Sequence, residues 1–410
     1  MARSSAFAAL FTSLLSASAA AQEPAPTGAG SSGARSAPAG TAASAPSSSP
    51  GDDGDSGLKA LLDQVSTPEQ RSKIRGGETG SYGLRLAEYG IAVEVHGYIS
   101  AEARIDSTGA PPFFDLHHQT LMLTANLFDR MTGEFALEVE HLGEEFYPPF
   151  AFMDFLAVKD LLTIRAGFFP VPIGAYNENL YPDFSHAPIN APLILRQIVP
   201  AGWSDVGAQV RGKFQLVGAL ALNYAMYAVN GLEQKDHDAN DGVVDDAGDI
   251  REMRFNATDS NHWDKGLGGR LGLSWVDLSV GMSGYSGAYT IDGRRRLSLV
   301  DVDATYDASG FEVRAEAVVA LQETAARLLT KWGAYAFAGY FLFENFEPFV
   351  QLDLADLGGG RSWRGLAGLA YHVFPRLAWG NMVKLEFSAK VNELTGETES
   401  VGMAQAVVAF

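Results

Sequence analysis

The 410-residue sequence contains no cysteine, so it can form neither disulfide bonds nor thiolate metal sites. Long apolar segments are also missing beyond the N-terminal region, although hydrophobic residues make up 47% of the chain. A membrane-spanning helix needs about 18 or more consecutive apolar residues, so the pattern disfavours a helical membrane protein. A chain without cysteine is also suited to crossing an oxidising compartment such as the periplasm.

Positive charge is scarce in this sequence. It has 30 lysine and arginine residues against 49 aspartate and glutamate residues, which gives a net charge of -19. Proteins that bind nucleic acids carry basic patches that neutralise phosphates. The composition therefore argues against nucleic acid as a partner, and we expect no cofactor.

Residues 1–21 have the pattern of a secretory signal peptide. Arg3 supplies a positive charge, residues 6–15 form a short apolar stretch, and small residues lead to cleavage positions after Ala19 or Ala21. The pattern predicts export from the cytoplasm.

Residues 22–87 are predicted to form a periplasmic linker with a short helical segment. Residues 22–56 are rich in Ala, Pro, Ser and Gly, a composition that cannot bury enough apolar surface to fold. Residues 57–75 are expected to form one or two short helices, and the alternative is a mobile tail.

From about residue 90 the apolar residues recur with a period of two, as in β-strands with one apolar face. In residues 134–140, Phe135, Leu137 and Val139 alternate with three glutamates. The same pattern predicts strands at 91–105, 116–128, 134–142, 151–158, 161–169, 204–214, 218–229, 267–275, 278–286, 297–306, 311–320, 330–341, 347–355, 364–373, 382–391 and 400–410.

Every second predicted connection is short, and most of the connections between these short ones are longer. The longest cover residues 170–203 and 230–266. Bacterial outer-membrane barrels have an even number of strands, short periplasmic turns and longer extracellular loops. Residues 88–410 are therefore predicted to form an all-β fold, a transmembrane antiparallel β-barrel of about 16 strands. Lipid and lipopolysaccharide of the bacterial outer membrane are the expected surroundings.

Aromatic residues cluster beside the short turns, as expected for the periplasmic girdle at the lipid–water boundary. They are Phe128, Phe135, Trp275, Tyr306, Phe311, Phe343, Phe346, Phe374, Trp379 and Phe410. The last strand places Phe410 on the lipid side, and we expect it to be an assembly signal whose deletion impairs insertion.

Strand alternation directs ten acidic and eight basic residues toward the lumen. A single charge in lipid costs roughly 2–4 kcal/mol, so this face predicts a hydrated pore. A sealed barrel with internal salt bridges is the alternative. The pore-lining candidates are Glu138, Glu140, Arg165, Asp205, Arg211, Lys213, Arg270, Asp301, Asp303, Arg314, Glu316, Lys331, Asp353, Lys384 and Glu386, and Glu134, Glu312 and Lys390 complete the set.

The segment 170–203, the third external loop, mixes proline, aromatic and apolar residues, unlike a solvated loop. We expect it to fold into the barrel and narrow the pore, and an external cap over the mouth is the alternative. Its polar groups expected to face the lumen are Asn177, Glu178, Asn179, Asp183, His186 and Arg196.

Acidic residues crowd the loop 230–266. Asp236, Asp238 and Asn240 are weak calcium candidates, because alternating oxygen ligands can bind Ca²⁺. Asp241 stands where a calcium loop starting at Asp236 would need glycine, so a solvated acidic loop without metal is favoured.

Three stretches resemble the phosphate-selective porin O and P family of outer-membrane channels: 151–174 (AFMDFLAVKDLLTIRAGFFPVPIG), 200–214 (PAGWSDVGAQVRGKF) and 259–273 (DSNHWDKGLGGRLGL). The resemblance spans roughly residues 88–410. It implies a sixteen-stranded barrel, usually trimeric, with an inward third loop and passive channel activity. It also implies assembly by the barrel assembly machinery, for which a terminal aromatic such as Phe410 is typical.

The family's phosphate selectivity rests on lysines and arginines at the constriction, and the sequence departs from that pattern. Pro170 and Gln351 stand where basic residues are frequent, and the third loop has only Arg196. We therefore expect a general porin with weak ion selectivity. A specific phosphate or anion channel and a structural or adhesin barrel without an open pore are the alternatives.

An enzyme is not expected. A barrel hydrolase needs a serine, a histidine and an orienting acid or amide, and only His117 and His118 are candidates in an early strand.

Overall fold

The computed structural model describes residues 82–86, 91–143, 145–179, 182–200, 202–233, 250–254, 264–290, 292–374 and 381–410. The predicted signal peptide, the predicted helices at 57–75 and the calcium candidates Asp236, Asp238 and Asn240 lie outside these residues.

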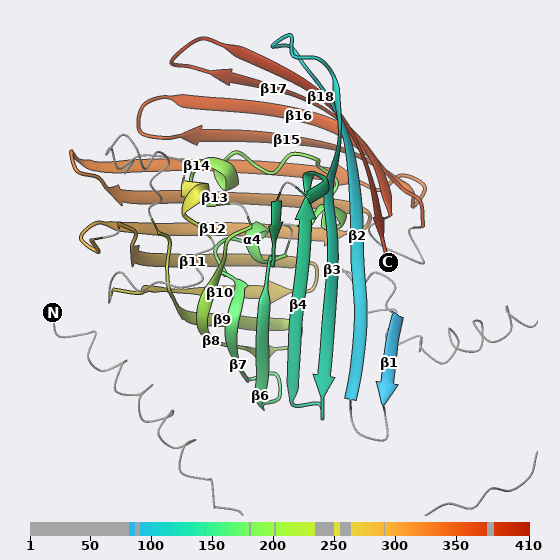
Figure 1. Cartoon of the computed structure of the whole chain (residues 1–410), viewed down its shortest axis with the longest axis vertical. Coiled ribbons are helices and arrows are strands. Elements are labelled where there is room, and N and C mark those ends of the chain that lie inside the picture. Colours follow the sequence, from blue (N-terminus) through green and yellow to red (C-terminus); the bar gives the residue numbers. More distant parts are fainter. Residues whose placement is uncertain are drawn as a thin grey trace, which may run out of the picture. The chain divides into compact units, whose positions relative to one another are not determined.

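The described chain is dominated by β-strands (Figure 1). The strands are β1 (Tyr82–Leu86), β2 (Ile91–Asp106), β3 (Phe113–Leu127), β4 (Met131–Glu140), β5 (Glu145–Tyr147), β6 (Ala151–Val158), β7 (Leu162–Pro170), β8 (Ser204–Val217), β9 (Leu220–Val229), β10 (Gly266–Trp275), β11 (Leu278–Ala288), β12 (Arg296–Ala308), β13 (Phe311–Glu323), β14 (Leu328–Tyr340), β15 (Phe346–Asp356), β16 (Arg361–His372), β17 (Met382–Asn392) and β18 (Thr398–Ala409).

Helical segments are short. They are η2 (His141–Gly143), α4 (Tyr176–Asn179), η3 (Asp183–Ser185), α5 (Ile194–Gln197) and η4 (Ile250–Met253). Within the part of the chain that the structure describes, no helix has the length and apolar composition needed to cross a bilayer.

Sixteen of the strands form a closed antiparallel barrel, as the sequence predicts. Each of these strands pairs with its neighbours along the chain, and β18 closes the ring on β2 from Val401↔Asp106 to Ala409↔Tyr98. The ring leaves out β5, which pairs with β4 beside β6, and β1. All sixteen predicted ranges correspond to observed strands, and every bound lies within three residues of the observed one.

The strand β1 is a difference from the sequence prediction, which assigned residues 22–87 to a linker. It pairs with the start of β2, from Tyr82↔Val95 to Leu86↔Ile91. Its five residues do alternate in sequence, with Tyr82, Leu84 and Leu86 against Gly83 and Arg85, a short signal that the sequence prediction did not use. The edge of β2 is therefore shared by two strands, with β18 along one part and β1 along the other.

The barrel reverses the usual distribution of apolar and charged residues. On β17, Val383, Leu385 and Phe387 point outward and are between 46% and 59% exposed. Between them, Lys384 and Glu386 point inward and are buried. Contact of this continuous apolar exterior with water would be unfavourable, whereas contact with hydrocarbon would be favourable.

Strand connections define the two ends of the barrel. One end, the short-turn end, carries the tight connections, such as the turn at Phe128 and Asp129, where both residues have positive φ. The other end, the long-loop end, carries the connections 171–203 and 230–265. The nine described aromatics of the predicted girdle lie at or beside the short turns, with side chains exposed, and Trp379 lies outside the described residues.

At the seam, the ring of Phe410 covers Gly97 of β2. The backbone N–H of each of these residues donates to the carbonyl oxygen of the other, at 2.9 Å in both cases. A Cβ on Gly97 would lie 2.6 Å from Cζ of Phe410 and 2.7 Å from the carbonyl oxygen of Thr120. The glycine therefore allows the aromatic ring to pack directly on the backbone.

We expect Gly97→Ala to lower the stability of the barrel by about 1–3 kcal/mol, because the added methyl group forces the seam apart. The midpoint of thermal unfolding, followed by the mobility shift on semi-native gels, measures this change. Gly133→Ala on β4 is the matched control, because a Cβ there meets nothing within 4 Å. Equal midpoints for the two variants would contradict the seam packing.

Candidate functional site

The connection between β7 and β8, residues 171–203, folds back into the barrel, as expected from the sequence. We call it the inward loop. It contains α4, η3 and α5, and Figure 1 shows α4 enclosed among the strands. Its backbone bonds to inward-facing side chains far away in sequence: Gly174 N–H donates to Ser283 Oγ at 2.9 Å, and Tyr176 N–H donates to Glu316 at 3.2 Å. These bonds exclude an external cap.

Glu386 on β17 is the most heavily used anchor of the inward loop. One carboxylate oxygen accepts the N–H groups of Ile189 at 2.7 Å and Asn190 at 3.3 Å, and the other accepts the Asn190 amide at 2.7 Å. Nearby, Arg364 is held by Asp353 at 2.7 Å and donates to the carbonyl oxygen of Ala191 at 2.7 Å. Such charge-assisted bonds are stronger than neutral ones.

Asn177 closes the base of the inward loop. Its amide donates to the carbonyl oxygens of Val171 and Trp203, and its oxygen accepts the Trp203 N–H, all at 2.9 Å. These three bonds join the two ends of a 33-residue connection, from residue 171 to 203.

Apolar side chains of the inward loop pack against one side of the barrel wall. Ile173, Ile194 and Ile198 are fully buried in one cluster with inward residues of β11 to β16, among them Tyr285 and Phe337. Part of the lumen is therefore a packed interior, where the sequence pointed to a hydrated one. The difference arises because several inward positions of β11 to β16 are apolar, and the loop supplies matching apolar groups.

His186 of the inward loop is buried and shares a 3.0 Å hydrogen bond with the Tyr176 hydroxyl. Burial, then the positive charges of Lys384 and Arg314, hold the pKa of His186 well below its ordinary value. The imidazole is therefore neutral at physiological pH and adds no positive charge to the lumen.

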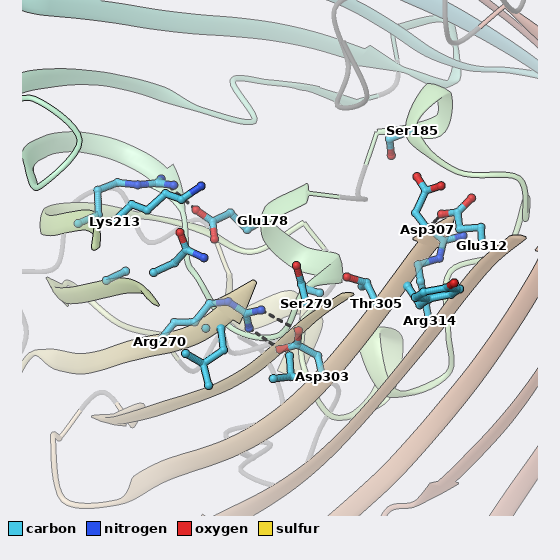
Figure 2. Close-up of a pocket in the computed structure, with 18 of the residues that line it drawn as sticks. Glu178, Ser185, Lys213, Arg270, Ser279, Asp303, Thr305, Asp307, Glu312 and Arg314 are labelled. Carbon is cyan, nitrogen blue, oxygen red and sulfur yellow. Dashed lines mark hydrogen bonds and ion pairs between the residues drawn. The ribbon is translucent and has the colours of Figure 1, made fainter. Parts of the chain in front are cut away.

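A charged cavity of about 1290 Å³ remains between the inward loop and the wall (Figure 2). On one side lie the loop residues Glu178 and Ser185. The cavity reaches residues at the short turns, such as Asp160, Gly310 and Glu344, so it lies on the short-turn side of the inward loop.

Ion pairs lie along the walls of this cavity. Arg270 and Asp303 form a two-pronged pair with N–O distances of 2.5 and 2.7 Å, drawn as dashed lines in Figure 2. Arg211 lies 2.9 Å from Glu178 of the inward loop, and Arg314 lies 3.4 Å from Glu312. Cationic and anionic groups thus alternate along the cavity surface.

The structure places all fifteen pore-lining candidates on the inward face, but in three settings. Five line the cavity: Arg211, Lys213, Arg270, Asp303 and Arg314. Four anchor the inward loop, directly or through Arg364: Glu316, Asp353, Lys384 and Glu386. The others lie elsewhere on the inward face and do not line this cavity: Glu138, Glu140, Arg165, Asp205, Asp301 and Lys331.

Of the inward-loop candidates whose side chains the structure describes, only Glu178 lines the cavity and pairs across it. The expectation of lumen-exposed groups fails for Asn177, Asp183 and His186, which are buried because they bond within the loop or to the wall. Asp183, for example, accepts from Gln405 at 3.2 Å. The side chains of Asn179 and Arg196 lie outside the described part of the chain.

Sequence reasoning missed several inward charged residues, among them Asp154, Glu347 and Arg364. Asp154 binds Arg165 through two 2.7 Å bonds, and Arg165 also lies over the ring of Phe152. Alternation with the outward Trp363 would have identified Arg364.

Solved structures with a similar fold are outer-membrane proteins. An anion-selective porin of Comamonas acidovorans superposes with a TM-score of 0.58 and 11% identity, covering 78% of this chain and 100% of its own. OmpF of Salmonella typhi, in complex with daunomycin, gives a TM-score of 0.56 and 13% identity over 80% and 100%. OmpT of Vibrio cholerae with loop L8 deleted gives 0.53 and 11% over 78% and 100%. At these identities the likeness concerns the fold.

No family model matches the chain, so the phosphate-selective porin O and P family is not established by that comparison. An uncharacterized protein of Aquifex aeolicus is 25% identical over 187 residues, which make up 45% of this chain and 38% of that protein. The match thus spans well under half the length of that relative.

We expect Glu386→Ala to loosen the inward loop, because three donors lose a buried charged acceptor. Each such bond contributes about 1.5–3 kcal/mol, so amide hydrogen exchange in residues 187–195 should be at least about tenfold faster. Hydrogen–deuterium exchange with mass spectrometry measures the change. Glu397→Ala, at an exposed turn between β17 and β18, serves as the control, and unchanged exchange in Glu386→Ala would contradict the anchoring role.

Proposed function

We propose that the protein is an outer-membrane porin through which small polar or charged solutes diffuse passively. The observation that carries the proposal is a charged cavity of about 1290 Å³ inside a closed barrel whose exterior is apolar. A lipid-exposed exterior and a polar interior are the two requirements of a barrel that conducts solutes.

The inward loop sets the narrowest part of the proposed path. Glu178 reaches from the loop to Arg211 of the wall, so a solute in the cavity passes between charged groups of both signs. Polar solutes can exchange their hydration for contacts with these groups, whereas apolar solutes gain nothing there. The geometry therefore favours small hydrophilic solutes.

Weak ion selectivity, with a slight preference for cations, follows from the composition of the cavity lining. It contains seven carboxylates, from Glu134, Asp160, Glu178, Asp303, Asp307, Glu312 and Glu344, against four basic groups, from Arg211, Lys213, Arg270 and Arg314. Local pairing cancels much of this difference, and salt screens the remainder over about 8–10 Å.

A specific phosphate or anion channel is the second candidate, favoured by the resemblance to the phosphate-selective family. The acidic lining of the cavity weighs against it, because phosphate recognition relies on clustered arginine and lysine donors. A structural or adhesin barrel without an open pore is the third candidate. We assign no catalytic role to the lumen.

The proposed surroundings are the bacterial outer membrane with its lipopolysaccharide. The protein would reach this membrane by export and by insertion through the barrel assembly machinery, for which Phe410 is the proposed signal.

A homotrimer is proposed as well, since a solved OmpT of Vibrio cholerae with this fold is described as a trimer form. An apolar hollow on the outer wall at β2, β3 and β16 to β18, lined by Ile105, Phe113 and Phe387 among others, offers a surface for such contacts.

Planar lipid bilayers provide the direct test of channel activity. Purified protein is expected to produce stepwise, ohmic current increments in potassium chloride, because the cavity inside the barrel is lined by charged groups of both signs. Heat-unfolded protein at the same concentration is the control. Complete lack of current from folded protein would leave the structural barrel as the better interpretation.

Asp303→Asn should shift selectivity toward anions, because it removes a carboxylate and leaves the Arg270 guanidinium without its charged partner. The reversal potential in a potassium chloride gradient is expected to move toward the chloride equilibrium potential. Glu397→Gln at the exposed turn is the matched control and should leave the reversal potential unchanged. A wild-type channel that is already strongly anion-selective would refute the acidic-lining argument.

A further inference from the structure

Three histidines gather on the barrel wall near the long-loop end, and none of them is among the residues that line the cavity described above. His117 and His118 lie on β3, and His141 lies in η2 directly after β4. The ring centroids of His117 and His118 are 3.9 Å apart, and those of His117 and His141 are 5.3 Å apart. One strand and the turn after its neighbour therefore bring three imidazoles together around His117.

Each of these histidines is oriented by its own carboxylate. The Nδ1 atom of His117 lies 3.0 Å from Glu102, that of His118 lies 2.8 Å from Asp183, and that of His141 lies 2.7 Å from Asp115. A carboxylate on Nδ1 fixes the ring and its tautomer and makes Nε2 the better metal ligand. In proteins, the ring nitrogen of a metal-binding histidine that does not bind the metal almost always donates to a carboxylate, a carbonyl oxygen or water.

Potential ligand atoms converge on His117 from three directions. They form three sets, each with all its atoms within 4.8 Å of one another: His117 with Asp115 and His141, His117 with His118 and Glu140, and His117 with Glu102 and Asp183. In addition, His118 Nε2 lies 3.2 Å from Glu140. His117 belongs to all three sets, so an ion bound to it has potential ligands from each of them.

The cluster is accessible to an ion. The His117 side chain is 26% exposed and that of His141 is 37% exposed, whereas His118 is 8% exposed behind them. An ion can therefore reach His117 and His141 from the solvent side, with the buried His118 and Glu140 completing the site.

We propose that His117, His118 and His141, with Glu140 and Asp115, form a binding site for one divalent transition-metal ion such as Zn²⁺. Imidazole nitrogen and carboxylate oxygen together suit zinc, copper and nickel, whereas calcium and magnesium prefer ligand sets made of oxygen. The excess of carboxylates around the three rings supplies negative charge that a divalent cation neutralises.

The site also connects the wall to the inward loop. Asp183, which orients His118, belongs to η3 of the loop, and its backbone oxygen accepts a 2.6 Å bond from Lys384 of β17. An ion bound at His118 would therefore strengthen the attachment of η3 to β3. The alternative is a network of protonated histidines and carboxylates that needs no metal, and such a network predicts no affinity for zinc.

Isothermal titration calorimetry tests the proposal, with zinc chloride titrated into the folded, detergent-solubilised barrel. We expect one zinc per chain in the wild type and loss of this binding in His117→Ala. Glu102→Gln keeps His117 as a ligand but removes the negative charge that orients its ring. This variant should weaken zinc affinity roughly 10–100-fold. His96→Ala is the matched control, because His96 lies on β2 and faces Glu94 at 3.7 Å, outside the cluster.

Folding of each variant is checked by the gel mobility shift, and His141→Ala, in a turn after β4, replaces His117→Ala if the latter does not fold. Three outcomes would overturn the proposal: no zinc binding by the wild type, equal zinc affinity in the wild type and the His117 or His141 variant, or calcium binding as tight as zinc binding. The titration requires no current, so its failure is distinguishable from a failure of the proposed porin function.

Discussion

The pairing of backbone N–H and C=O groups is the constraint on which the whole structure depends. In hydrocarbon no water can satisfy an unpaired strand edge, so a sheet in a membrane must close on itself. Here the closure is the antiparallel pairing of β18 with β2, residues that are about 300 positions apart in sequence. Once the ring is closed, alternation alone sends apolar side chains to the exterior and charged ones to the interior.

The charged interior then serves two purposes that alternation does not distinguish. Glu386 and Glu316 hold the backbone of the inward loop, whereas Arg270 and Asp303 border open space. Asp303 and Glu316 are register partners on β12 and β13, yet Asp303 borders the cavity and Glu316 binds the loop, so the role of an inward carboxylate depends on where the loop passes along the wall. The path of the loop along the wall therefore determines which charges border the cavity.

The sequence predicted the sixteen barrel strands well because period-two alternation and the parity of short and long connections are local signals. It also predicted that the inward loop enters the barrel, from its apolar composition. It did not predict β1, an isolated run of five residues, or β5, whose three residues are too few to show alternation. The buried role of Asn177 was also missed, because it depends on where the two loop ends meet. His117 and His118 stood out in the sequence, but His141 and Glu102 join them only through pairing between strands.

The shared edge of β2 has a consequence for how the barrel keeps its register. Beyond the residues paired with β18, the same edge is occupied by β1, which begins opposite Val95, two positions from Gly97. A slip of β18 by two residues in that direction would preserve the inside–outside alternation, so side-chain burial alone would not prevent it. The slip would, however, require β18 to displace β1 from backbone positions already in use. The short strand β1 therefore limits how far β18 can shift along β2.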